Sequence, residues 1–191
     1  MIPAARCPLR RYRAAMDPLP YLAGYPADVQ TRVRALRDAG RLGDYLARRY
    51  PEPHAVRNDR QLYDYVQALK DRYLRQSTPL HKAVYDGKLQ VLKHALGTHT
   101  TISRVQGGRL KANREIRVAS VFRDAPAAFL EMIVVHELAH LKESDHNRAF
   151  YNLCTHMLPD YHQLEFDLRL YLMHREAQSA APSGAEDDVD R

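Results

Sequence analysis

Hydrophobic positions in the first part of the chain recur at helical spacing. Val29, Val33 and Leu36 fall at i, i+4 and i+7, and Gly40 closes the pattern, which is how an amphipathic helix ends. The next apolar run, residues 42–50, predicts a second short helix, because a proline follows it at once. Two helices are therefore expected before residue 51.

A third helix is expected after a Pro-Glu-Pro break. Asn58 or Asp59 can cap its start, since a short polar side chain accepts hydrogen bonds from the free backbone N–H groups of a first turn. Its apolar positions form one stripe, whose expected role is packing: Leu62, Val66, Leu69 and Tyr73. Residues 17–78 are thus predicted as an all-helical N-terminal section.

Strand patterns follow in the middle of the chain. Residues 82–85 are a candidate strand, while residues 88–96 fit a strand or a helix. Residues 100–105 and 109–119 are separated by Gly107-Gly108, which predicts a hairpin. The end of its second arm alternates apolar and polar positions, as a half-buried strand does.

Helical patterns return after the predicted strands. Asp124 is a candidate N-cap and Pro126 suits a first helical turn, so an apolar helix is expected from there to about Leu141. A further helix is predicted over residues 146–157. The sequence Asp160-x-x-Gln163 resembles a capping box, which predicts a last helix.

Composition divides the chain into four parts. Residues 1–16 carry four arginines and no acid, and residues 177–191 form an acidic tail; both ends are expected to be disordered. Between them, the helical section of residues 17–78 precedes residues 79–176, which combine a small antiparallel or mixed sheet with helices. No internal repeat is evident. The predicted fold class is α+β.

Composition also excludes several classes of protein. No apolar run approaches the roughly 18–20 residues of a membrane helix, and residues 1–16 lack the apolar segment of a secretory signal. Two cysteines without a Cys-x-x-Cys motif exclude a disulfide scaffold and a cysteine-based zinc ribbon. A cytoplasmic location is therefore expected. The net charge is +6, of which residues 17–176 hold +5, and this allows a polyanionic partner such as nucleic acid.

Candidate chemistry lies in the apolar helix, in the sequence His-Glu-Leu-Ala-His at residues 136–140. Because residues i and i+4 share one helix face, His136 and His140 can bind a single cation. Glu137 is rotated by about 100° and can approach a water on that cation instead. Burying two histidines and a carboxylate without partners would cost several kcal/mol, so a metal site is favoured over plain packing.

A third histidine, His146, follows six residues after His140. Ser144 or Asp145 can cap the next helix, which would place His146 in its first turn. Three imidazoles leave the fourth position of a zinc ion open for water, as in a catalytic site. The spacing equals that of metzincins, but Glu143 stands where their glycine would be, which argues against membership of that group.

Other side chains compete for the third ligand position or for a supporting role. Glu165, His156 and His162 are alternative ligands. His156, Tyr161 and His162 are also candidates to hold a ligand or to stabilise charge in the transition state. A surface or packing role explains each of these three at least as well.

The segment from residue 133 to 157 resembles the YgjP-like and SprT-like zinc metallopeptidases. These families share H-E-L-x-H-L followed by H-x-x-x-F, here residues 136–141 and His146 to Phe150. The resemblance extends over roughly residues 80–175. It departs at residues 96–100, where Leu-Gly-Thr-His-Thr stands in place of the Trp-Gly-Ser-Cys-Ser that is common in YgjP-like proteins.

The resemblance implies a zincin-like domain with one Zn²⁺ per chain, held by His136, His140 and His146, and Glu137 as catalytic base. It also implies a substrate-binding strand, here residues 116–120. SprT-like proteins associated with DNA often add a cysteine-rich zinc module, which two cysteines cannot build, so a crosslink-repair role is not favoured.

The expected function is zinc-dependent hydrolysis of a peptide or protein substrate, with Glu137 as general base. The alternative is a zinc-stabilised module that binds nucleic acid through its basic charge, with little or no proteolysis. No membrane partner is expected, and the sequence does not indicate an oligomeric state.

Overall fold

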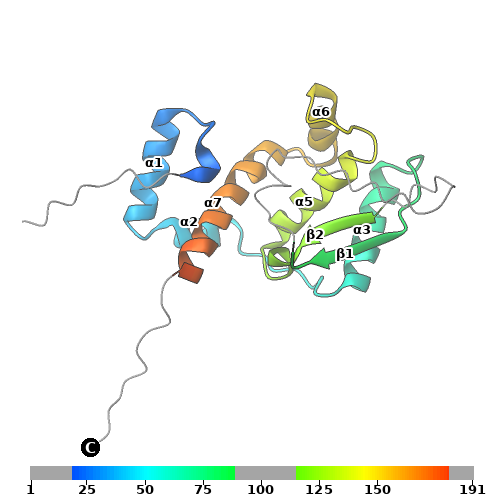
Figure 1. Ribbon diagram of the computed structural model, residues 1–191, viewed down its shortest axis with the longest axis horizontal. Coiled ribbons are helices and arrows are strands. Elements are labelled where there is room, and N and C mark those ends of the chain that lie inside the picture. Colours follow the sequence, from blue (N-terminus) through cyan, green and yellow to red (C-terminus); the bar gives the residue numbers. More distant parts are fainter. Residues whose placement is uncertain (1–18, 89–114, 181–191) are drawn as a thin grey trace, which may run out of the picture.

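Helices dominate the architecture, and a two-stranded sheet lies among them (Figure 1). The computed structural model describes residues 19–88 and 115–180. Its long helices are α1 (Ala27–Asp38), α2 (Leu42–Arg49), α3 (Asp59–Tyr73), α5 (Ala127–Ala139), α6 (Arg148–Met157) and α7 (Tyr161–Ala180). Short 3₁₀ helices cover Pro20–Leu22 (η1) and Ser120–Arg123 (η2), and the strands are β1 (Lys82–Asp86) and β2 (Glu115–Ala119).

The three predicted N-terminal helices are confirmed. After α1 the chain turns at Gly40, whose φ of 67° lies in the left-handed region that favours glycine. The cap of α3 is Asn58, whose side chain accepts from Gln61 N at 3.0 Å. Asp59 has another role, because its carboxylate accepts from Tyr85 N in β1 at 2.9 Å. The start of α3 is thereby tied to the sheet.

The described sheet corrects the expected strand arrangement. β1 and β2 run parallel, with Ala83 opposite Ile116 and Tyr85 opposite Val118, whereas an antiparallel or mixed sheet was expected. Parallel neighbours cannot be joined by a tight turn and need a long crossover. Local turn signals such as Gly107-Gly108 therefore could not reveal this pairing. The predicted arm at residues 100–105, the start of the second arm and residues 89–96 lie outside the described residues.

The start of α5 differs from the expected cap. Pro126 occupies the N-cap position, and no side chain caps the helix. Asp124 instead pairs with Arg57 at 2.8 Å. The first N–H of the helix, that of Ala127, donates to Glu52 O at 2.9 Å. A segment that precedes α3 in the chain thus supplies the cap, because it passes close to the start of α5.

The start of α6 also differs from the expected cap. Asn147 is the N-cap, and its side chain accepts from Phe150 N at 2.9 Å. Neither Ser144 nor Asp145 has this position, so His146 lies in the loop before the helix and not in its first turn. The last helix begins at Tyr161, directly after Asp160, where a start was predicted. Gln163 does not complete a capping box in the described hydrogen bonds, but donates to Asp167 at 2.9 Å.

α7 joins the two ends of the molecule. It extends from the side of α6 to the N-terminal helices (Figure 1) and contacts η1, α2, α5 and α6. Buried residues from Leu19 to Met173 belong to one hydrophobic cluster. Its centre is α5, in which Leu130, Val134 and Leu138 are at most 1% exposed. In the described part of the chain, no helix combines the length and the apolarity needed to cross a bilayer.

Candidate metal centre

Three histidines converge at the end of α5. His136 lies in its last turn, His140 follows as its C-cap residue, and His146 returns from the loop before α6. The Nε2 atom of His140 lies 3.3 Å from that of His136 and 3.1 Å from that of His146, and the remaining pair is also 3.1 Å apart. The three ring nitrogens expected to share one cation are therefore brought together.

This donor set fits a small divalent metal ion. Spacings of 3.1–3.3 Å between donors are those of bonds of about 2.0 Å at tetrahedral angles, the length of bonds from zinc to imidazole nitrogen. Three nitrogen lone pairs aimed at one point repel each other, and a cation at that point removes the repulsion. Imidazole suits several transition metals, so the cluster indicates a divalent ion without selecting zinc.

Two of the histidines have a hydrogen bond on the far side of the ring. His136 Nδ1 lies 2.7 Å from the hydroxyl of Tyr161, and His140 Nδ1 lies 2.9 Å from Glu143 O. A proton on Nδ1 leaves the Nε2 lone pair for a metal. Such partners fix the tautomer and the orientation of ligand imidazoles. Glu143 contributes its backbone here, at the position where metzincins have glycine.

The ring of Phe150 packs against all three histidines. Its ring centroid lies 5.0 Å from that of His136, 4.6 Å from that of His140 and 4.7 Å from that of His146. The side chain is fully buried. Because aromatic packing restricts all three imidazoles at once, Phe150 limits the positions available to their nitrogens. Phe150 closes the H-x-x-x-F motif, whose spacing alone predicts no role for it.

Glu137 follows the first ligand along α5. A part of the residue remains exposed to solvent, while its carboxyl lies deep among protein atoms. Burial raises the pKa of the Glu137 carboxyl to about 7 in the metal-free protein. A carboxyl with a pKa near neutrality exchanges a proton readily at physiological pH, which suits a general acid and base.

The other predicted candidates lie outside the cluster. His156 is exposed and packs its ring 6.3 Å from that of Tyr73. Glu165 pairs with Arg169 at 3.2 Å, and His162 lies 3.9 Å from Glu165 with 61% of its side chain exposed. Among the described residues, the only group suited to a metal by its donor atoms is the histidine cluster. Of the supporting candidates, Tyr161 is the one that contacts a cluster histidine by hydrogen bond.

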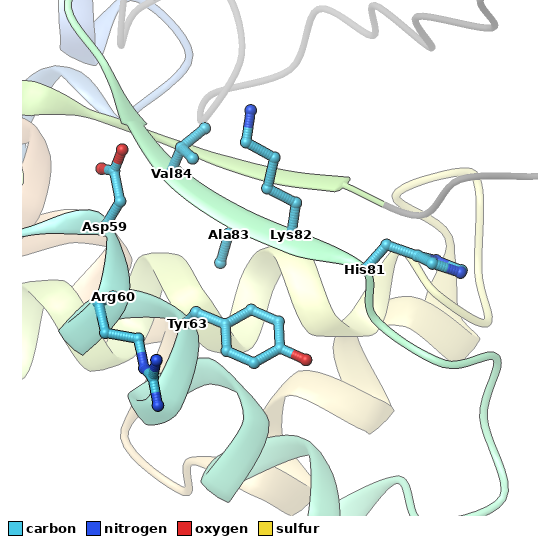
Figure 2. A pocket seen from close by; sticks show the side chains of 7 residues that line it. All are labelled: Asp59, Arg60, Tyr63, His81, Lys82, Ala83 and Val84. Atoms are coloured by element: carbon cyan, nitrogen blue, oxygen red, sulfur yellow. The ribbon is translucent and has the colours of Figure 1, made fainter.

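A separate pocket of about 320 Å³ lies between α3 and β1. Figure 2 shows Asp59 and Tyr63 on the helix, with Ala83 pointing toward it from the strand. Three of its polar side chains have partners already: Asp59 accepts from Tyr85 N, Tyr63 donates to Leu80 O at 3.4 Å, and Lys82 pairs with Glu115 at 3.5 Å. None of the cluster histidines lines this pocket. The pocket is a packing gap between the helix and the strand.

Comparison with known proteins indicates the family of this chain. The model of the YgjP-like metallopeptidase domain matches residues 54–171. The chain is also 60% identical over 157 residues to a protein of Escherichia coli (strain K12) named UTP pyrophosphatase, across 82% of this chain and 94% of that protein. No solved structure matches the chain. With a family model that spans most of the chain and covers all three clustered histidines, the protein belongs to the YgjP-like metallopeptidase-domain family.

Proposed function

We propose that this protein is a metal-dependent hydrolase that cleaves UTP to UMP and diphosphate. One observation carries the choice of substrate: the relative named UTP pyrophosphatase is 60% identical and is matched over 94% of its length. The histidine cluster and Glu137 supply a hydrolytic site that does not depend on which bond is cleaved. The activity in the name of the relative is therefore compatible with a domain whose family is named for peptidases.

The chain supplies a proton acceptor and a set of ligands for the reaction. His136, His140 and His146 would hold the metal, and zinc is proposed because three imidazoles with an open fourth position are typical of catalytic zinc. When bound, such an ion acidifies a water and neutralises charge on phosphate oxygens. Glu137 would accept a proton from the attacking water. The water oxygen forms a bond to the α-phosphorus, the bond from that phosphorus to the bridging oxygen breaks, and diphosphate leaves.

Charge also favours an anionic substrate. Residues 17–176 carry a net charge of +5, and a nucleoside triphosphate carries several negative charges at neutral pH. A positive protein attracts such a substrate over a distance of about one Debye length, roughly 10 Å at 0.1 M salt. A decrease of kcat/KM with increasing salt is therefore expected for UTP.

The direct test is product analysis on the full chain loaded with Zn²⁺. UTP should yield UMP and diphosphate in equal amounts, resolved by ³¹P NMR, and UDP with phosphate should not appear. Glu137→Gln serves as the matched control, because it keeps the shape of the side chain and removes its basicity. Equal turnover by this variant would assign the activity to a contaminant and would refute the proposal.

A peptidase activity is the second candidate, because the matching family model describes a metallopeptidase domain. The same residues would serve, with a carbonyl carbon in place of phosphorus as the atom attacked. An extended peptide would lie beside β2, the strand predicted to bind substrate. Incubation with a peptide library, followed by mass spectrometry, separates the candidates: cleavage lost in Glu137→Gln, without UTP turnover, would favour the peptidase. The nucleic-acid-binding alternative stays a prediction.

A further inference from the structure

Tyr161 connects the last helix to the histidine cluster. Its hydroxyl lies 2.7 Å from His136 Nδ1, and its side chain is fully buried, as is that of Cys154 in α6. The thiol of Cys154 lies beside the same hydroxyl. Three buried side chains from α5, α6 and α7 thus lie together, and one of them is a proposed metal ligand.

A hydroxyl beside an imidazole can donate or accept, and the two cases have opposite consequences. If Tyr161 donates to His136 Nδ1, the neutral ring carries its proton on Nε2, and that proton occupies the metal-binding position. If Tyr161 accepts, the proton lies on Nδ1 and the Nε2 lone pair faces the cluster. The direction of this single hydrogen bond therefore decides whether His136 is competent to bind a metal.

Cys154 offers the hydroxyl an acceptor for its own proton. A tyrosine has one proton to donate, so a hydroxyl that donates to the sulfur must accept from Nδ1. Sulfur is a weak acceptor. Both side chains are buried, however, and a buried hydroxyl that donates to no acceptor would cost free energy. His140 needs no such arrangement, since its Nδ1 partner is the Glu143 carbonyl, which can only accept.

We propose that Tyr161 is a positioning residue, which holds His136 in the tautomer that binds the metal, and that Cys154 orients its hydroxyl. The contact between α6 and α7 thereby affects the tautomer of a proposed ligand. The inference depends on metal binding by the histidine cluster and not on the identity of the substrate.

The test measures metal affinity in the full chain, with Zn²⁺ alone in competition with a chromophoric chelator. Tyr161→Phe keeps the ring and removes the hydroxyl, and should weaken Zn²⁺ binding by about 10- to 100-fold. Cys154→Ala should weaken binding by a smaller factor, roughly two- to tenfold, because the hydroxyl then loses its preferred acceptor. Thermal unfolding of the metal-free variants shows whether the fold is kept.

Tyr151→Phe is the matched control. The ring of Tyr151 lies 6.3 Å from that of His146, and within the described residues its hydroxyl makes no hydrogen bond to the cluster. Its removal should leave Zn²⁺ affinity unchanged. Equal losses in Tyr161→Phe and Tyr151→Phe would reduce Tyr161 to a packing residue and overturn the inference.

The tautomer itself can be observed by ¹H–¹⁵N NMR of the histidine rings. In the Zn²⁺-loaded protein, the His136 ring should show a proton on Nδ1 that exchanges slowly with water, and Tyr161→Phe should accelerate this exchange. Unchanged affinity in Tyr161→Phe would overturn the inference while leaving the metal site in place. Failure of the unmodified protein to bind Zn²⁺ would overturn the site and the inference together.

Discussion

Two polar clusters contact α7, and they differ in the kinds of groups that they bring together. One is the histidine cluster at its start. The other surrounds Asp167, which is fully buried. Its carboxylate oxygens accept from Tyr50 at 2.6 Å, Gln163 at 2.9 Å and Tyr45 at 3.3 Å, and Arg49 lies 3.1 Å away. The Asp167 cluster combines an acceptor with donors and a positive charge, whereas the histidine cluster brings three like groups together.

The difference separates a structural cluster from a binding site. Around Asp167 the protein supplies every partner that a buried carboxylate needs, so nothing has to be added from solution. The phenol of Tyr50 keeps its proton more strongly than usual, since burial and the hydrogen bond to Asp167 both raise its pKa. The Nε2 atoms of the histidine cluster lie within 3.3 Å of each other and are completed best by a cation.

The two clusters contact α7 at different positions along its length. Tyr161 contacts the histidine cluster from the first turn, while Asp167 binds the helix to α2. Beyond Asp167, α2 and α7 also pack closely. A Cβ atom added at Gly43 would lie 2.8 Å from the ring of His174. The N-terminal helices thus brace the helix that supports the proposed metal ligand.

Loss of a histidine ligand should have the largest effect on metal binding and activity. His140→Ala removes one of three imidazoles and should abolish stoichiometric metal binding, along with hydrolysis, because two neutral ligands hold a divalent ion poorly. Elemental analysis after dialysis checks this result. His156→Ala, at an exposed position, is the control and should retain one metal per chain. Retention of full metal content by His140→Ala would show that His140 is not a ligand.

Removal of the proposed base should be the next largest effect. Glu137→Gln should lower kcat for UTP by about 10²–10⁴ while metal content stays at the level of the unmodified protein. The reason is that a glutamine can occupy the same space but cannot accept the proton of water. Steady-state kinetics and elemental analysis on one preparation check both halves. A large loss of metal in this variant would instead make Glu137 a ligand.

The Asp167 cluster should affect stability and not metal affinity. Asp167→Ala leaves Tyr50 and Arg49 without their buried partner and should lower the free energy of unfolding by about 2–4 kcal/mol, measured by urea denaturation. Asp64→Ala, which removes an exposed ion pair with Arg60, should change it by less than about 1 kcal/mol. If Asp167→Ala weakened Zn²⁺ binding as much as Tyr161→Phe, the two clusters would be functionally one.

The smallest effect expected is a pH dependence in the metal-free protein. Burial raises the pKa of Glu137 from 4.5 to about 7, so the folded state binds this proton more tightly than the unfolded state. Stability should therefore fall as pH rises through this range. The partial exposure of the residue limits the change to about 1–2 kcal/mol. Urea unfolding with chelator at pH 5 and pH 8 should show this fall relative to Glu137→Gln, and a constant difference between the proteins would contradict it.

Local features of the chain were predicted well. The spacing of His136 and His140 depends only on the helix repeat, so an apolar helix was enough to place them on one face. Helix ends at Gly40 and at Asn58 also follow from neighbouring residues. Neighbouring residues do not select a cap where several candidates stand close together, and the structure has Asn147 as the cap in place of Ser144 or Asp145.

The amino-acid sequence was enough to predict the helices, the motif at residues 136–140 and the third histidine, because each depends on neighbours within a few residues. The folded chain was needed to reveal the parallel pairing of β1 with β2, the contact of Tyr161 with His136 and the bonds of Asp167 to α2. These contacts join segments that are distant in sequence. Their partners are selected by the packing of the whole core, and no periodicity along the chain encodes that selection.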